Sequence, residues 1–84
     1  SGDDTRSWGP PWLERGGCRE SAYFLSANRN KRSLTVDLGS DEGQALVAAL
    51  ADKADVLIEN FRTGTMQRWG LGAETLRDRN PRLI

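Results

Sequence analysis

The chain has 84 residues, of which 37% are hydrophobic; 12 Lys and Arg balance 12 Asp and Glu, and there is no His. A chain of this length holds at most one small domain, and its balanced charge gives no long-range attraction to nucleic acid or to an anionic membrane. Without His, and with Cys18 as its one Cys, it offers no His/Cys metal cluster, no Ser-His-Asp triad and no internal disulfide.

Residues 1–32 have the composition of an irregular, loop-rich lead-in. Gly9-Pro10-Pro11 excludes regular helix between Trp8 and Trp12, and two Trp in a loop are expected to pack against other groups. Residues 21–27 fit a short helix or a short strand equally well. The basic run at 28–32 has two interpretations, a solvated loop or a phosphate contact with Lys31 as its point charge.

Residues 33–61 are predicted to form a βαβ unit. Leu34, Val36 and Leu38 alternate with polar residues, which is typical of a strand. Ser40 then caps a helix over about 41–53, whose first turn is acidic and whose apolar residues recur at three- and four-residue spacings. The apolar run at 56–58 suits a second, parallel strand covered on both faces. The predicted fold is therefore α/β, with a right-handed crossover.

Residues 62–84 are predicted to hold short helices and the start of a third strand. Thr65 caps a helix over 66–69, and a second helix over about 73–79 stops at Asn80-Pro81. Leu83 and Ile84 open an apolar run typical of a new strand. Since natural domains rarely stop inside such a strand, we expect these residues to be part of a longer protein.

The carboxyl ends of parallel strands meet at one edge of a sheet, where open α/β sheets bind ligands. Residues 37–39 and 59–62 follow the two predicted strands. Asn60, Phe61 and Arg62 offer an amide, a ring and a guanidinium just before a helix N-terminus, and Arg68 lies one turn later, so the edge suits a phosphate or carboxylate. The alternative is that the arginines are solvated, the ring is core and the amide caps a turn. No G-x-G-x-x-G or G-x-x-x-x-G-K-[ST] motif is present.

Five segments stand in order along the chain: Gly2–Arg6, Trp8–Pro11, Asn28–Leu34, Ala54–Arg62, and Leu71-Gly72 with Asn80–Ile84. In this order they resemble the family III CoA-transferases (the CaiB/BaiF type), which include formyl-CoA transferase, carnitine CoA-transferase and the α-methylacyl-CoA racemases. The resemblance implies a fragment of a Rossmann-like parallel sheet, from the large CoA-binding domain of an interlocked homodimer. Residues 1–84 would be part of that domain.

The resemblance also implies which residues line the CoA site. One segment matches by position at Val36, Asp37, Leu38 and Gly39, and another at Asn60, Phe61 and Arg62; Arg68 matches an arginine that reaches the nucleotide end of CoA. Two departures concern these segments. Thr63 stands where the family often has Pro, and Gly39 stands where it often has Lys or another polar residue, so Gly39 offers only backbone contacts.

The implied activity is transfer of CoA from an acyl-CoA to a carboxylic acid through an enzyme-aspartyl intermediate, without a metal. The nucleophilic Asp of the family lies downstream of Ile84, so no catalytic residue is expected among these 84 residues, which alone would be inactive. Two alternatives stay open: an acyl-CoA racemase or epimerase of the same family, and a non-catalytic CoA- or nucleotide-binding module. The single Cys and the absence of an apolar run of about 18 residues favour a cytoplasmic location (mitochondrial or peroxisomal in a eukaryote), with neither membrane nor nucleic acid as partner.

Overall fold

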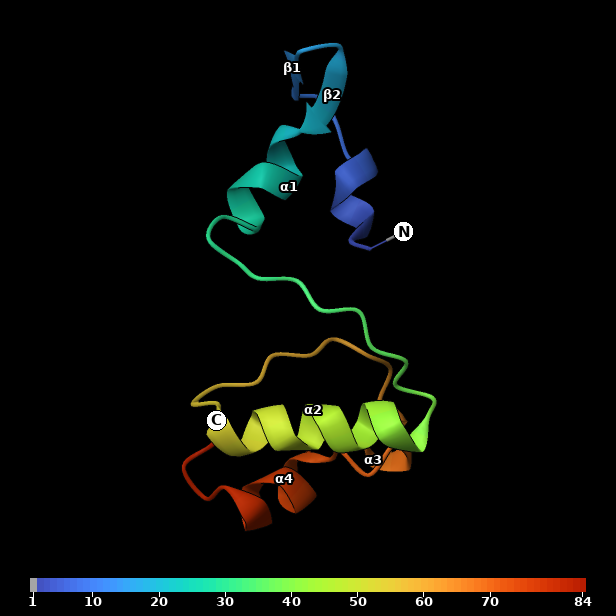
Figure 1. Ribbon diagram of the computed structural model, residues 1–84, viewed down its shortest axis with the longest axis vertical. Helices are drawn as coiled ribbons and strands as arrows, with labels where there is room; N and C mark the ends of the chain where they lie inside the picture. The colour runs from blue at the N-terminus through green and yellow to red at the C-terminus, as the bar shows by residue number, and fades with distance from the viewer. Residues whose placement is uncertain (1) are drawn as a thin grey trace. The chain divides into compact units, whose positions relative to one another are not determined.

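The computed structural model describes residues 2–84, and the chain divides into two compact units, Ser1–Leu34 and Thr35–Ile84. Unit 1 holds the 3-10 helix η1 (Asp4–Ser7), the strands β1 (Trp12–Arg15) and β2 (Cys18–Ser21), and the helix α1 (Ala22–Ala27). Unit 2 holds three helices, α2 (Asp41–Lys53), α3 (Thr65–Arg68) and α4 (Ala73–Arg79), as Figure 1 shows. The division falls two residues after the end of the predicted lead-in.

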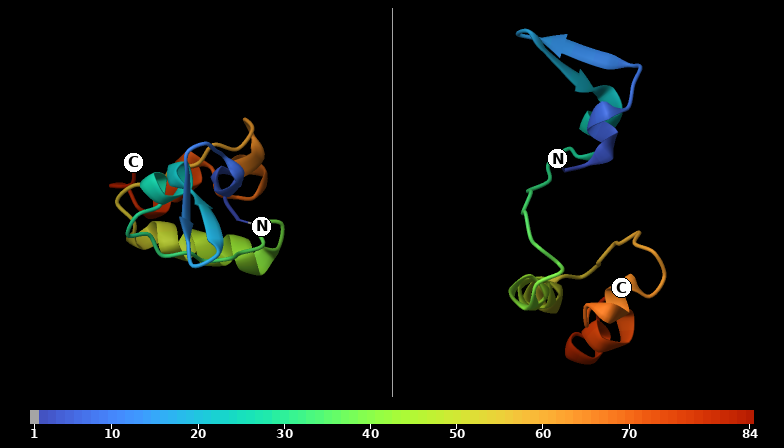
Figure 2. Two further views of the ribbon diagram at one scale, coloured as in Figure 1. Left: turned by 90° about the horizontal axis from the view of Figure 1, so that it is seen from above. Right: turned by 90° about the vertical axis from the view of Figure 1, so that its right-hand side faces the viewer.

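Unit 1 contains a β-hairpin where the sequence predicted an irregular loop. β1 and β2 are antiparallel, with Trp12 opposite Ser21 and Arg15 opposite Cys18 (Figure 2). Gly16 and Gly17 join them with φ of 59° and 79°, and a two-residue hairpin turn of type I′ requires positive φ at both positions. The prediction of an irregular loop was wrong for these residues, because Gly16-Gly17 is a preferred hairpin turn that composition alone does not reveal.

Polar and aromatic contacts hold unit 1 together, since no apolar side chain in residues 2–34 is fully buried. Ser21 is 1% exposed; its hydroxyl accepts from the N–H of Phe24, which caps α1, and donates to the carbonyl of Trp8. The rings of Trp8 and Tyr23 meet edge to face at 5.0 Å. Trp8 therefore packs on a neighbour, as expected of a Trp in a loop, and α1 settles the open choice at 21–27 in favour of a helix.

A carboxylate ties the two helices of unit 1 together. Asp3 caps η1 by accepting from the N–H of Thr5 at 2.9 Å, and its other oxygen accepts from the side-chain amide of Asn28 at 3.0 Å. The hydrogen bond that Asp3 accepts from Thr5, then the one from Asn28, and the nearby charge of Lys31 lower the pKa of Asp3.

In unit 2, α2 confirms the predicted helix. Ser40 is its N-cap, with the hydroxyl accepting from the N–H of Gly43, and Asp41 and Glu42 occupy the acidic first turn. α4 also matches its prediction. α3 starts one residue earlier than predicted: Gly64, with φ of 89°, takes the N-cap position without a side-chain hydrogen bond.

The core of unit 2 lies among its three helices and the C-terminal residues. It comprises six buried side chains, Ala48, Ala51, Met66, Leu71, Leu76 and Leu83. Leu38, Val47, Ala54, Leu57 and Trp69 pack against this cluster while staying partly exposed. The segment after α2 thus returns across the core before α3 begins.

The structure assigns no strand to residues 33–38 or 56–58, and this differs from the predicted βαβ unit. Among residues 2–84, no backbone hydrogen bond joins 33–36 to another segment, and a strand needs such a neighbour. Ile84, however, donates to the carbonyl of Asp55 at 3.0 Å and accepts from the N–H of Leu57 at 2.9 Å. This is the parallel pattern, in which one residue bonds to the two that flank its partner, here Val56.

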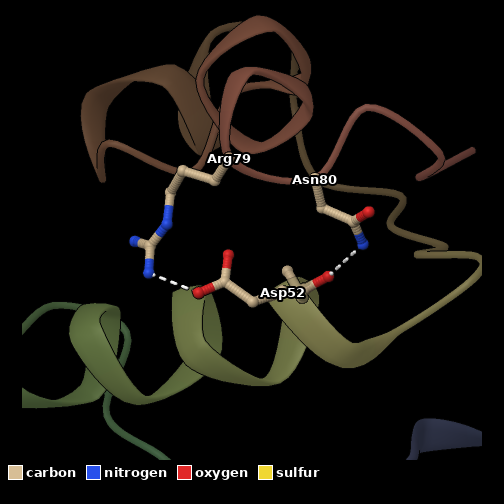
Figure 3. Close-up of polar contacts among 4 residues, drawn as sticks. Asp52, Arg79 and Asn80 are labelled. Carbon is tan, nitrogen blue, oxygen red and sulfur yellow. Dashed lines mark hydrogen bonds and ion pairs between the residues drawn. The ribbon is translucent and has the colours of Figure 1, made fainter.

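The C-terminal ends of α2 and α4 are tied together by Asn80 and Arg79. The buried side-chain amide of Asn80 donates to the carbonyls of Ala51 at 3.0 Å and Ala54 at 2.9 Å. Arg79 forms an exposed ion pair with Asp52 at 2.6 Å (Figure 3). In the described part of the chain, no helix is long and apolar enough to cross a membrane.

Candidate functional site

The first predicted CoA-lining segment, residues 36–39, is a turn fastened to the start of α2. The carbonyl of Asp37 accepts from the hydroxyl and the N–H of Ser40, at 2.8 and 3.2 Å, and its carboxylate accepts from the N–H of Gly39 at 2.9 Å. The side chain of Gln44 donates to the carbonyl of Leu38 at 2.9 Å. The N–H of Gly39 is therefore already hydrogen-bonded, and backbone contacts from this glycine are left to its carbonyl.

Gly43 lets this turn approach α2 closely. A Cβ at Gly43 would lie 1.9 Å from the carbonyl oxygen of Asp37, far inside van der Waals contact. Any other residue at this position would displace either the first turn of α2 or the 37–39 segment. The sequence contained no signal for this close approach, because a Gly in the first turn of a helix indicates by itself only a low helix propensity.

The second predicted segment is held by its own backbone and by one carboxylate. Glu59 accepts from the N–H of Phe61 at 2.8 Å, and the carbonyl of Arg62 accepts from the N–H of Thr65 at 3.0 Å. Asn60, Phe61 and Arg62 are all exposed. The interpretation of Phe61 as a core residue is therefore wrong, because 47% of this residue is exposed.

Arg68 lies on α3, close behind this segment. Its guanidinium donates to the hydroxyl of Thr65 at 3.3 Å, and the rest of the side chain is exposed. The sequence predicted that Thr65 caps this helix. In the structure, Gly64 is the N-cap and the hydroxyl of Thr65 accepts from Arg68 instead. Within residues 2–84, no carboxylate forms an ion pair with Arg62 or Arg68, so both positive charges remain uncompensated.

An aromatic pair joins the loop to α3. The rings of Phe61 and Trp69 meet at 5.3 Å with an interplanar angle of 82°, and Trp69 is half-buried against the core. Sequence reasoning did not connect Trp69 with Phe61, because the turn at Gly64 lies between the two aromatics and no periodicity links them.

α2 begins, and the segment 55–62 ends, at the same end of unit 2 (Figure 1). The 36–39 and 60–62 segments thus lie at one end of the unit, although neither of them follows a strand in this structure. No hydrogen bond in the described chain joins the two segments. Their assignment as CoA-lining residues stays a prediction.

Other candidates from the sequence carry less chemistry. Lys31 donates to the side-chain oxygen of Asn28 at 3.5 Å, in unit 1. Cys18 is exposed beside the hairpin turn and bears no disulfide. No three Cys, Asp or Glu side chains gather into a possible metal site in the part of the chain that the structure covers.

Comparison with known proteins identifies the fold and the family. The model of the family described as CoA-transferase family III matches residues 1–84. The succinate–glutarate CoA-transferase of Agrobacterium fabrum is 49% identical over 99% of this chain and 21% of its own length. The succinyl-CoA:mesaconate CoA-transferase of Haloarcula hispanica is 48% identical, again over 99% of the chain and 21% of that protein.

Solved structures agree with this. A crystal structure of a CaiB/BaiF family protein from Brucella suis matches 98% of the chain and 22% of its own, with a TM-score of 0.80 and 50% identity. Rv3272 from Mycobacterium tuberculosis matches with a TM-score of 0.82 and 43% identity, over 98% of the chain and 22% of its own. The chain spans about a fifth of the length of these relatives.

Proposed function

Because the chain belongs to the CoA-transferase family III, we propose that the whole protein moves CoA from an acyl-CoA to a carboxylic acid. Similar proteins are named for succinyl transfer with glutarate or mesaconate, which makes short dicarboxylic acids the first acceptors to test. We further propose that the whole protein is a homodimer that uses no metal and acts in the cytoplasm, or in mitochondria or peroxisomes if its source is a eukaryote.

The proposed chemistry is nucleophilic catalysis by an aspartate. The carboxylate attacks the thioester carbonyl, releasing CoA thiolate and forming an acyl anhydride; the thiolate then attacks the aspartyl carbonyl of the anhydride and frees the first acid. The acceptor carboxylate then attacks the aspartyl-CoA thioester, which releases the CoA thiolate and forms a second anhydride. The thiolate attacks the acceptor carbonyl of this anhydride, which gives the new acyl-CoA and frees the aspartate. Following the family resemblance, we place this aspartate in the part of the protein beyond these 84 residues, which span only about a fifth of the length of the relatives.

These 84 residues would contribute to the CoA pocket, and one observation carries this proposal. The exposed ring of Phe61 lies in the loop between α2 and α3, which also carries the uncompensated charge of Arg62, and the uncompensated charge of Arg68 lies on α3. An aromatic ring and two guanidinium groups are the groups that bind a purine base and phosphates. Val36, Asp37, Leu38, Gly39 and Asn60 would line the same pocket.

The formation of a new acyl-CoA from an added acid tests the proposed activity. The whole protein that carries this chain is incubated with succinyl-CoA and either glutarate or mesaconate, and the products are followed by mass spectrometry. New acyl-CoA supports the proposal. Deuterium uptake at the α-carbon without CoA exchange would identify a racemase or epimerase instead, and CoA binding without either reaction would identify a non-catalytic module.

A matched pair of variants tests the pocket. Arg68→Ala is expected to weaken CoA binding about tenfold in calorimetric titration, because a charge-assisted hydrogen bond to phosphate is lost. Arg15→Ala removes an exposed arginine of β1 and serves as the control with unchanged affinity. Equal affinities for the two variants would mean that Arg68 is only a surface charge.

A further inference from the structure

A half-buried tryptophan holds the exposed ring of the proposed pocket. Trp69 packs against the buried cluster of unit 2, and its ring meets that of Phe61 at 5.3 Å and 82°. Edge-to-face pairs of this geometry are favourable because the positive edge of one ring meets the negative face of the other. The orientation of Phe61 is therefore set by a side chain that the core itself fixes.

The backbone on both sides of this pair is also fixed. The N–H of Trp69 is shared between the carbonyls of Thr65 at 3.3 Å and Met66 at 3.2 Å, and both of these residues are buried. The N–H of Phe61 is held by the carboxylate of Glu59 at 2.8 Å. The backbone that carries each ring is therefore held in place, although the loop that contains Phe61 is exposed.

The exposed ring lies close in sequence to two cations. Arg62 follows Phe61 directly, and Arg68 precedes Trp69 directly. In the proposed pocket, these guanidinium groups are the candidates to bind the phosphates of a ligand whose base stacks on this ring. Base stacking on an aromatic side chain contributes about 1–3 kcal/mol, and less of this is offset by ordering of the ring if the ring is already oriented when the ligand arrives.

We propose that Trp69 is a positioning residue that holds Phe61 ready to stack on the adenine of CoA. This inference rests on the proposed function, since it assumes that the site binds CoA. It assigns Trp69 no contact with the reacting atoms. Its effect should therefore fall on recognition of the nucleotide half of the ligand alone.

The test compares CoA with 4′-phosphopantetheine, which lacks the adenine nucleotide, by calorimetric titration of the whole protein. Trp69→Leu removes the ring edge and keeps an apolar side chain, and we expect CoA binding to weaken about 2- to 12-fold, the range of an edge-to-face pair. Binding of 4′-phosphopantetheine should not change. Trp69→Phe, which keeps an aromatic edge, should restore most of the CoA affinity.

Trp8→Leu is the matched control, because Trp8 forms a similar edge-to-face pair with Tyr23 in unit 1. It should leave both affinities unchanged. Equal weakening of both ligands by Trp69→Leu would show that Trp69 only supports the core and would overturn the inference, as would an unchanged CoA affinity. Failure of the unsubstituted protein to bind CoA would instead overturn the proposed function.

Discussion

Asn80 offers the sharpest test of how unit 2 is held together. Its buried amide donates to the carbonyl of Ala51, in the last turn of α2, and to the carbonyl of Ala54, the residue that follows the helix. Asn80→Ala removes both hydrogen bonds at once and leaves the carbonyl of Ala54 without a partner, whereas the carbonyl of Ala51 still accepts from the N–H of Ala54. The segment 55–57, which directly follows these carbonyls, pairs with Ile84, so this pairing should loosen first.

The size of the effect follows from the number of hydrogen bonds. Each contributes about 0.5–1.5 kcal/mol net, and a buried carbonyl left without a partner costs about 1–3 kcal/mol. Some of this cost is recovered where water enters, so we expect a loss of about 2–4 kcal/mol in the free energy of local opening. This corresponds to an opening equilibrium that is about 30- to 900-fold larger.

Hydrogen exchange at the amides of Leu57 and Ile84 measures this opening directly, since these two N–H groups form the parallel pair. Arg79→Ala is the matched control: it breaks the ion pair to Asp52 between the same two helices, and an exposed pair contributes only about 0–1 kcal/mol. If Asn80→Ala accelerates exchange no more than Arg79→Ala does, the amide of Asn80 does not hold the two helix ends together.

Two further predictions concern the turn before α2 and the N-terminal cap. Gly43→Ala should lower the free energy of unfolding in urea by more than about 2 kcal/mol, a typical cost of overpacking, because its Cβ would lie 1.9 Å from the carbonyl oxygen of Asp37. Gly39→Ala is the control and should cost clearly less, because its Cβ would meet only the Asp37 carboxylate at 3.2 Å. Equal losses for the two variants would contradict the steric explanation. The lowered pKa of Asp3 means that its contribution to stability is present above the ordinary carboxyl pKa and is lost as the pH falls through the lowered value. Carbon-detected NMR titration of this carboxyl should show a midpoint below that of an unstructured Asp, and Asp3→Asn should flatten the acid limb of the stability profile of unit 1; a midpoint at the ordinary value would refute the proposed hydrogen bonds.

The helices of unit 2 could be predicted from the sequence because their signals are local. Ser40 as N-cap, the acidic first turn and the three- and four-residue spacing of apolar residues all act within α2, and α4 ends at the residue before Asn80-Pro81 as expected. The ordered motifs also identified the family, which the family model and the solved relatives confirm. The Phe61–Arg62 loop and Arg68 could be chosen as candidates because the residue types alone show that they offer an aromatic ring and guanidinium groups.

What depended on residues far apart could not be predicted in this way. The predicted strands at 33–38 and 56–58 required hydrogen-bonding neighbours, and the structure provides one such neighbour only at Val56, through Ile84. The two donations from Asn80, the close approach at Gly43 and the contact between Phe61 and Trp69 each join positions separated by a turn or a helix. Sequence patterns report the periodicity of one element, whereas these contacts depend on how elements pack. The chain's residue types thus determined its family and the chemistry available to it, and tertiary packing decided which side chains are held ready to use that chemistry.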